Sequence, residues 1–248
     1  MGCLGLRHVR AFSSLLIGLT KVSAPSAKSN AIFTLACALV AAACITLPAT
    51  AASVLAVNGQ AQLIRLQQFS SVIVGTQVLE SDALLLAPDA EVLVQFDDGA
   101  KMVVRGDSQL LFRKLVEAGA VEVRQKTLQI IKGGLRYLSG VLTIRKKVAF
   151  ETASATVGIR GTDLEIAVSD MPVAGNPAGT YLKVNTGQAV LAGLDGGEVE
   201  LNRGEVAFGA EPQLTPRGTR AIARPSAARI EVIPPSVFKS AQLDSFLK

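Results

Sequence analysis

The stretch FETASATVGIRGTDLEIAV, Phe150 to Val168, contains two runs that favour β-strands, one on each side of the break GIRGT. In this break Gly158 and Gly161 flank Arg160. Glycine permits positive φ angles and close backbone approach, so the segment can bulge out of its sheet and re-aim a side chain. The stretch therefore predicts paired strands interrupted by a bulge at Arg160.

Arg160 has two possible roles at such a bulge. A guanidinium held against Ile159 and Leu164 needs an anionic or carbonyl partner, because orphaning a buried charge costs roughly 3 to 5 kcal/mol. The sequence offers loop carbonyls and three carboxylates without choosing among them: Asp163, Glu165 and Glu151. We favour an internal brace, with Thr162 bonding a turn amide, over a binding surface. The candidate structural or binding motif comprises Gly158, Arg160, Gly161, Thr162 and Asp163.

Alternating apolar and polar residues continue through residues 54–209, in short runs separated by glycine. In AEVLVQFDDGAKMVV, alternate residues share one face up to a turn at Asp98-Gly99, a dipeptide that favours a hairpin. The turn at Asp195 repeats the pattern. Residues 108–131 could form one helical turn, but alternation favours strands there too. We predict an all-β domain of short antiparallel strands, five or six residues each.

The first 51 residues have the composition of an export signal. Ala31 to Leu47 is uncharged and apolar, and Ala49-Thr50-Ala51 has the small residues that signal peptidase requires. We predict a signal peptide over residues 1–51, cleaved near Ala51. An uncleaved membrane anchor is the alternative, since 17 apolar residues lie at the short limit of a span. Lipid attachment at Cys44 is disfavoured because Ala41 replaces the branched residue expected before it.

The residues after this leader are nearly neutral and poor in reactive groups. The leader holds four of the 25 basic residues and none of the 20 acidic ones, which leaves 21 against 20. A nucleic-acid partner, which requires a basic face, loses its support. The leader also contains His8 and every cysteine: Cys3, Cys37 and Cys44. Thiol nucleophiles, Ser-His-Asp relays and Cys/His zinc sites are therefore excluded. We predict no catalytic residue, no metal and no cofactor.

The C-terminal residues change in character after Gly209. Proline, alanine and arginine dominate residues 210–235, which we interpret as an extended linker. Ser236 could cap a short helix over residues 236–248. Its apolar stripe is poor, consisting of Val237, Phe238, Ala241 and Phe246. A helix of this length is marginal alone in water, so we expect it to dock on the β domain, or else to serve as a peptide for a partner.

The stretch around Arg160 resembles the signature of the FecR-type envelope domain. In that family a strand ending in Thr-x-x-Ala-x-x-x-x-Arg-Gly-Thr leads into an apolar strand, and Thr152, Ala155 and Arg160 fit this spacing. With this signature included, the resemblance covers about residues 54–210. Four weaker matches occur in the same order as in the family. They are Gly59 to Leu63, Glu80 to Val104, Ile130 to Gly140 and Val184 to Leu191.

The resemblance implies an all-β, sandwich or jelly-roll-like domain that is non-catalytic. Founding members of the family place a cytoplasmic anti-sigma portion before a transmembrane helix, and their periplasmic domain relays a signal from an iron-siderophore receptor. Here the thirty residues before the apolar run are too few for a folded regulator. We therefore expect a stand-alone FecR-like domain over residues 52–209, periplasmic or secreted, that touches a membrane only if its leader is retained.

Two functions fit these expectations. The first is a protein- or ligand-binding module in envelope signalling or regulation, which contacts an envelope or outer-membrane protein through exposed sheet edges. The alternative is a structural module of the cell surface or extracellular matrix that holds polymer or a secreted protein. The sequence does not fix the oligomeric state or the identity of the partner.

Overall fold

The computed structural model describes residues 52–116, 124–140, 146–210, 227–231 and 236–247. The chain divides into two units, 1–48 and 49–248, and the described residues all belong to the second. The proposed export signal and most of the proposed linker lie outside the described residues. Among the described helices none is long and apolar enough to cross a membrane.

The described residues form a single hydrogen-bonded sheet of 15 strands and one short 3₁₀ helix, η1 (Gln242–Leu247). The strands are β1 (Ala52–Asn58), β2 (Ala61–Arg65), β3 (Gln68–Ser71), β4 (Gln77–Val78), β5 (Ala83–Leu86), β6 (Glu91–Phe96), β7 (Lys101–Val104), β8 (Gln109–Val116), β9 (Arg124–Leu138), β10 (Lys146–Glu151), β11 (Ala155–Ser169), β12 (Gly179–Gly193), β13 (Glu198–Leu201), β14 (Val206–Ala210) and β15 (Ala227–Ile230).

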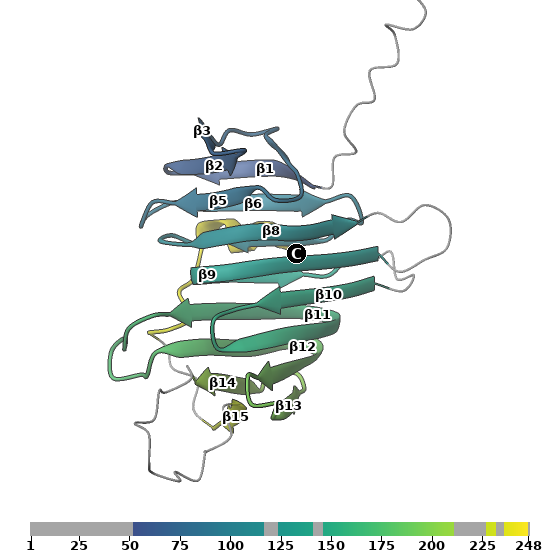
Figure 1. Ribbon diagram of the computed structural model, residues 1–248, viewed down its shortest axis with the longest axis vertical. Coiled ribbons are helices and arrows are strands. Elements are labelled where there is room, and N and C mark those ends of the chain that lie inside the picture. The colour runs from purple at the N-terminus through teal and green to yellow at the C-terminus, as the bar shows by residue number, and fades with distance from the viewer. Residues whose placement is uncertain (1–51, 117–123, 141–145, 211–226, 232–235, 248) are drawn as a thin grey trace, which may run out of the picture. The chain divides into compact units, whose positions relative to one another are not determined.

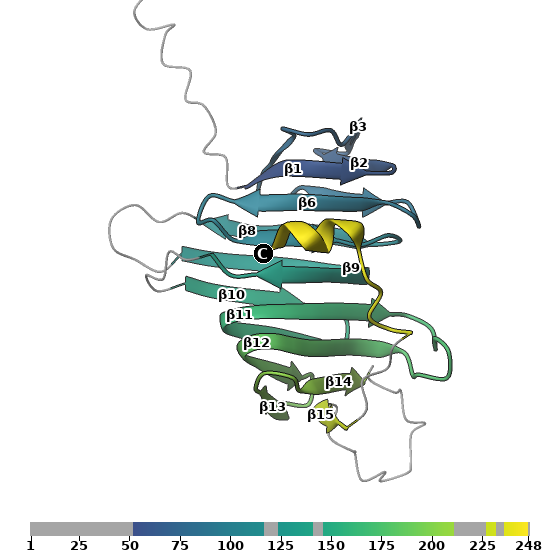
Figure 2. The same cartoon turned by 180° about the vertical axis from the view of Figure 1, so that it is seen from behind.

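The sheet doubles over into two layers, because β9, β11 and β12 each contribute one half to each layer (Figures 1 and 2). The layer facing the viewer in Figure 1 runs β3-β2-β5-β8-β9-β10-β11-β12-β13. The layer facing the viewer in Figure 2 runs β4-β1-β6-β7-β9-β11-β12-β14-β15. We call these the first layer and the second layer.

Glycines allow the long strands to pass between the layers. β9 pairs with β8 up to Lys132 and with β7 from Leu135, and Gly133 between them has φ of +90°. A Cβ on Gly133 would lie 2.2 Å from the Ser108 hydroxyl. β12 bends at Gly187, where φ is +81° and an added Cβ would lie 2.3 Å from a backbone oxygen of β11. Both positions therefore require glycine on grounds of conformation and of space.

The core lies between the layers and consists of the inward-facing residues of each alternating strand. Tyr137 lies near its centre, with ring centroids 6.1 Å from Phe96 and 5.3 Å from Phe150 in edge-on geometry. The largest fully buried aliphatic side chains are Leu84, Met102, Leu110, Leu128, Ile130, Leu135, Leu164 and Ile166. Burial of these apolar surfaces supplies most of the driving force for folding.

The predicted all-β class is confirmed, whereas the predicted strand lengths and pairing are wrong in part. β9, β11 and β12 each have 15 residues, because a bent strand can serve both layers. β10 pairs in parallel with β9. The region that could have formed a helical turn is strand β8, as alternation indicated, and the Asp98-Gly99 turn joins β6 to β7.

The C-terminal segment docks on the outer face of the second layer, as expected, but its conformation differs from the predicted helix. Only Gln242–Leu247 is helical, and it is a 3₁₀ helix. Leu243 and Leu247 pack against Leu93 and Val103. Phe246, which we had assigned to the apolar stripe, is 55% exposed. The first turn is fixed by Glu91, whose carboxylate accepts hydrogen bonds from two backbone N–H groups of η1.

Candidate functional site

The bend in β11 separates the five residues of the candidate motif. Residues up to Arg160 pair with β10 and the distal half of β12 in the first layer, whereas residues from Asp163 pair with β9 in the second layer. Arg160 is exposed, and Thr162 and Asp163 are buried. One motif in the sequence thus contributes to two different environments.

Thr162 holds the bend in place. Its hydroxyl donates to the carbonyl of Gln188 at 2.7 Å. The Ser139 hydroxyl accepts from the Thr162 N–H at 2.9 Å and donates to the Thr162 carbonyl at 3.0 Å. Our expectation that Thr162 bonds a turn amide is wrong, because its hydroxyl meets a carbonyl. These bonds join the end of β9, the bend of β11 and the bend of β12 at one edge of the sheet.

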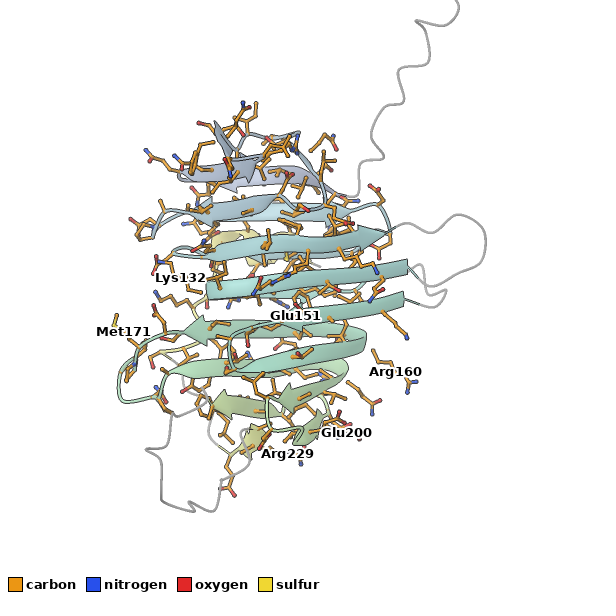
Figure 3. All side chains as sticks on the ribbon, in the orientation of Figure 1. Lys132, Glu151, Arg160, Met171, Glu200 and Arg229 are labelled. Carbon is orange, nitrogen blue, oxygen red and sulfur yellow. The ribbon has the colours of Figure 1, made fainter. Side chains whose placement is uncertain are left out.

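Arg160 is not the internal brace that we favoured. Ile159 packs against the core, so its neighbour Arg160 projects away from the core into solvent. In the part of the chain that the structure describes, the Arg160 side chain has no hydrogen bond or ion pair. Figure 3 shows it at the edge of the sheet, away from the core. A fully solvated guanidinium needs no protein partner, so neither Glu151 nor Asp163 is required to neutralise it.

Arg160 belongs to a polar row that crosses β10, β11 and β12 of the first layer and ends at Asn202, the residue after β13. Gln188 is its paired residue on β12, and the Gln188 amide donates to Asn202 at 3.1 Å. On the other side of β11, Ala149 of β10 pairs with Gly158, and the two strands are antiparallel. Lys147, two residues before Ala149, therefore lies level with Arg160, two residues after Gly158. We call Lys147, Arg160, Gln188 and Asn202 the Arg160 row.

A groove of about 470 Å³ runs beside the Arg160 row. Gly158 lies in its floor, and no atom lies within 4 Å of the place where a Cβ would stand on it. Val190 and Leu201 supply apolar surface, and Glu200 supplies the one carboxylate of the lining. The polar lining thus has two cations and two amides but one carboxylate. It suits a ligand with an anionic or carbonyl group, because guanidinium and amide N–H groups donate hydrogen bonds to such oxygens.

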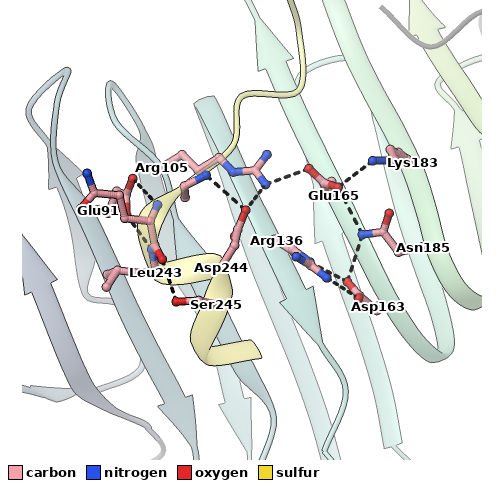
Figure 4. A network of polar contacts seen from close by, with 12 residues as sticks. Glu91, Arg105, Arg136, Asp163, Glu165, Lys183, Asn185, Leu243, Asp244 and Ser245 are labelled. Atoms are coloured by element: carbon pink, nitrogen blue, oxygen red, sulfur yellow. Dashed lines mark hydrogen bonds and ion pairs between the residues drawn. The ribbon is translucent and has the colours of Figure 1, made fainter. Parts of the chain in front are cut away.

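The other half of the motif lies in a buried network on the outer face of the second layer (Figure 4). Asp163 accepts two hydrogen bonds from Arg136, at 2.9 and 2.7 Å. Glu165 accepts from Arg105 at 2.7 Å and from Lys183 at 2.9 Å. Asn185 bridges the two carboxylates at 3.2 Å each. Asp244 of η1 binds Arg105 from above at 3.1 Å.

The network keeps the Glu165 carboxylate ionised. Burial raises the pKa of Glu165, but the hydrogen bonds from Lys183 and Arg105 outweigh it and lower the pKa to about 2. The hydrogen bond to Asp163 raises the pKa of Arg136. We assign a structural role to this network, because its charges pair with one another and η1 covers Arg105.

Sequence reasoning named Asp163 and Glu165 as acceptors for an arginine, but it missed the arginines that bind them. Arg105 directly follows β7 and Arg136 lies on β9, both far away in sequence, and they become neighbours of the carboxylates only through strand register. The alternation of Asp163 and Glu165 with buried Leu164 is the one signal in the sequence that a polar outer face exists. Among the described residues no cluster of three metal-ligating side chains occurs.

The comparisons with known proteins identify no family. No protein-family model matches the chain, and no curated protein matches it. Two crystal structures of a candidate anti-sigma factor from Parabacteroides distasonis align with it at 13% and 12% sequence identity, both with a TM-score of 0.41. Each alignment covers 51% of this chain and 54% of that protein, so the chain spans about half its length. A likeness of this degree carries no inference about function.

Proposed function

We propose that this protein is a non-catalytic, exported FecR-like module that binds a partner in cell-envelope signalling or regulation. The binding surface is the Arg160 row with its groove. The partner presents a carboxylate or a series of carbonyl oxygens to Arg160 and Lys147, and it is an envelope or outer-membrane protein. The motif resemblance supports the envelope role, and the lack of Cys and His after residue 51 supports a binding function rather than catalysis.

The observation that carries this proposal is the contrast between Arg160 and the other arginines near it. Arg105 and Arg136 each have carboxylate partners in the fold. Arg160 has none among the described residues, and it stands beside a groove together with the exposed amides of Gln188 and Asn202. Guanidinium groups bind carboxylates and carbonyls in fixed fork geometry, so an available arginine in a groove favours specific recognition.

Site-specific cross-linking in the native envelope tests the proposal. A photo-crosslinking residue in place of Gln188 should capture one dominant protein partner, identified by mass spectrometry. Arg160→Ala should reduce that product at least tenfold, because a charge-assisted hydrogen bond contributes about 1.5 to 3 kcal/mol. Arg113→Ala is the matched control, because Arg113 is also exposed on the first layer but lies on β8, outside the groove.

The outcomes separate the two functional classes. An unchanged product in Arg160→Ala would refute the Arg160 row as the binding surface. Capture of polysaccharide instead of protein would favour the structural module that holds surface polymer. Accumulation of a cleaved product from the captured partner would refute the non-catalytic assignment.

A further inference from the structure

A second cavity lies at the opposite edge of the sheet from Arg160. It has a volume of about 150 Å³, and its walls come from the bend of β9, the end of β11, the loop before β12 and residues 236–239 of the C-terminal segment. Figure 3 shows Lys132 and Met171 at this edge and Arg160 at the other. The Arg160 row contributes no residue to this cavity, so the two sites are separate.

Arg105, one of the residues that line this cavity, carries a buried donor without an acceptor in the described part of the chain. Arg105 is 5% exposed, and its Nη2 binds both Glu165 and Asp244. Its Nε is buried and has no hydrogen-bond partner among the described residues. Asp244 Oδ1, on the carboxylate that already binds Arg105, is likewise buried without a partner within the described ranges, so both unpaired atoms belong to the buried Arg105–Asp244 contact and the exposed groups of the wall are left to meet a ligand.

The charges around the cavity balance, which restricts the class of ligand. The Lys132 ammonium is 2.7 Å from the Asp107 carboxylate, and Arg105 is neutralised by Glu165 and Asp244. The remaining charged side chains of the lining are one cation and one anion, Lys239 and Asp170. Both are exposed on the wall, and Asp170 also helps to raise the pKa of Lys132. A polyanion would meet unfavourable carboxylates here, whereas a zwitterion matches both signs.

Aliphatic side chains complete the lining. Ala167, Val168, Val173 and Val237 contribute apolar surface between the polar groups. A cavity of this volume accommodates a molecule about the size of benzene. These dimensions suit a small aliphatic amino acid with its carboxylate and ammonium at one end.

We propose that this cavity binds a small aliphatic α-amino acid. The carboxylate accepts from Lys239, the ammonium binds Asp170, and the side chain contacts Val173 and Val237. Residues 236–239 form one wall, so an occupied cavity favours the docked C-terminal segment over the undocked one. The proposal does not depend on the function assigned to the Arg160 row.

Titration of the ¹⁵N-labelled protein with L-valine tests the proposal by NMR. The amide signals of Gly133, Gly134 and Val237 should shift saturably. Isovalerate, which lacks the ammonium, and isobutylamine, which lacks the carboxylate, should bind at least tenfold more weakly, because each loses one charge-assisted contact. Equal binding of either analogue, or no saturable binding of L-valine, would overturn the proposal.

Two variants sharpen the experiment without touching the buried network. Asp170→Asn should weaken L-valine binding at least tenfold, whereas Glu198→Gln, at an exposed carboxylate on β13 outside the lining, should leave it unchanged. Val237→Phe should fill the cavity and abolish binding in a folded protein. Unaltered affinity in Asp170→Asn or in Val237→Phe would refute the site. Arg160→Ala should bind L-valine normally, which keeps this test separate from that of the Arg160 row.

Discussion

The two halves of β11 show how differently one strand can place its charges. Arg160 and Glu165 are five residues apart, and both face away from the core. Arg160 stands in solvent on the first layer, whereas Glu165 is buried on the second layer, with its side chain 10% exposed and paired with Arg105 and Lys183. The bend at Gly161 and the cover provided by η1 create this difference.

The comparison teaches that a charged side chain that points away from the core can have either of two roles. It can stabilise the fold through ion pairs, or it can remain available to a binding partner. On the second layer, neighbouring strands supply Arg105 and Arg136, and the C-terminal segment adds Asp244. Around Arg160 the neighbouring strands supply amides and a second cation, and no described segment covers them. The same alternating pattern therefore produces a stabilising network on one face and a free surface on the other.

The largest expected effect comes from breaking the network at Glu165. Glu165→Ala removes the carboxylate that Arg105 and Lys183 share and leaves Asp244 as the remaining carboxylate on Arg105, and removing one partner of a buried ion pair costs about 3 to 5 kcal/mol. Urea unfolding should show this loss as a lower midpoint with an unchanged slope. Glu151→Ala on the first layer is the control: its carboxylate is 42% exposed and 3.9 Å from Arg113, so the change should stay below about 1 kcal/mol. Equal effects would contradict the contrast between the faces.

The bends that create the contrast can be tested by two matched glycine substitutions. Gly187→Ala places a methyl group 2.3 Å from the backbone oxygen of Gly161, in addition to the strain of a positive φ. We expect a loss of about 3 kcal/mol in unfolding free energy, as for other strained or overpacked sites. Gly161→Ala meets no atom within 4 Å, so only the left-handed backbone penalty of about 1 to 2 kcal/mol remains. Thermal unfolding of both variants measures the difference, and a larger loss for Gly161→Ala would contradict this account.

The pattern of residues was sufficient to predict the all-β class and the position of the break, but not the passage of strands between layers. Alternation reports which residues share a face, and Leu164 and Ile166 are buried as the pattern indicates. It does not report which strands become neighbours. The register that brings Arg136 to Asp163 depends on pairing between distant segments, so the brace was assigned to Arg160 instead. The parallel pairing of β10 with β9 likewise leaves no local signal.

The pH dependence of stability should report the network through Glu165. Because its folded pKa of about 2 lies below the ordinary value of 4.5, folding favours the ionised carboxylate. The stabilisation is fully present above pH 4.5 and is lost as the pH falls toward 2. Protonation leaves the side chain in place, so the effect should be smaller than that of truncation.

Urea midpoints measured from pH 7 to pH 2.5 give this dependence for wild type and for Glu165→Gln. The difference between the two proteins should be largest above pH 4.5 and should shrink as the pH falls. Other carboxylates titrate in both proteins and cancel in the difference. A constant difference across this range would show that Glu165 is not held ionised by Lys183 and Arg105.

The smallest effect on stability is expected at Arg160, and it completes the comparison. Because the Arg160 side chain is exposed and has no partner among the described residues, Arg160→Ala should change the unfolding free energy by less than about 0.5 kcal/mol. Arg136→Ala, which removes the bidentate partner of buried Asp163, should cost several times more. Differential scanning calorimetry of the two variants under identical conditions measures both. If Arg160→Ala destabilised the fold as much as Arg136→Ala, Arg160 would be a structural residue and the groove beside it would lose its claim as the binding surface.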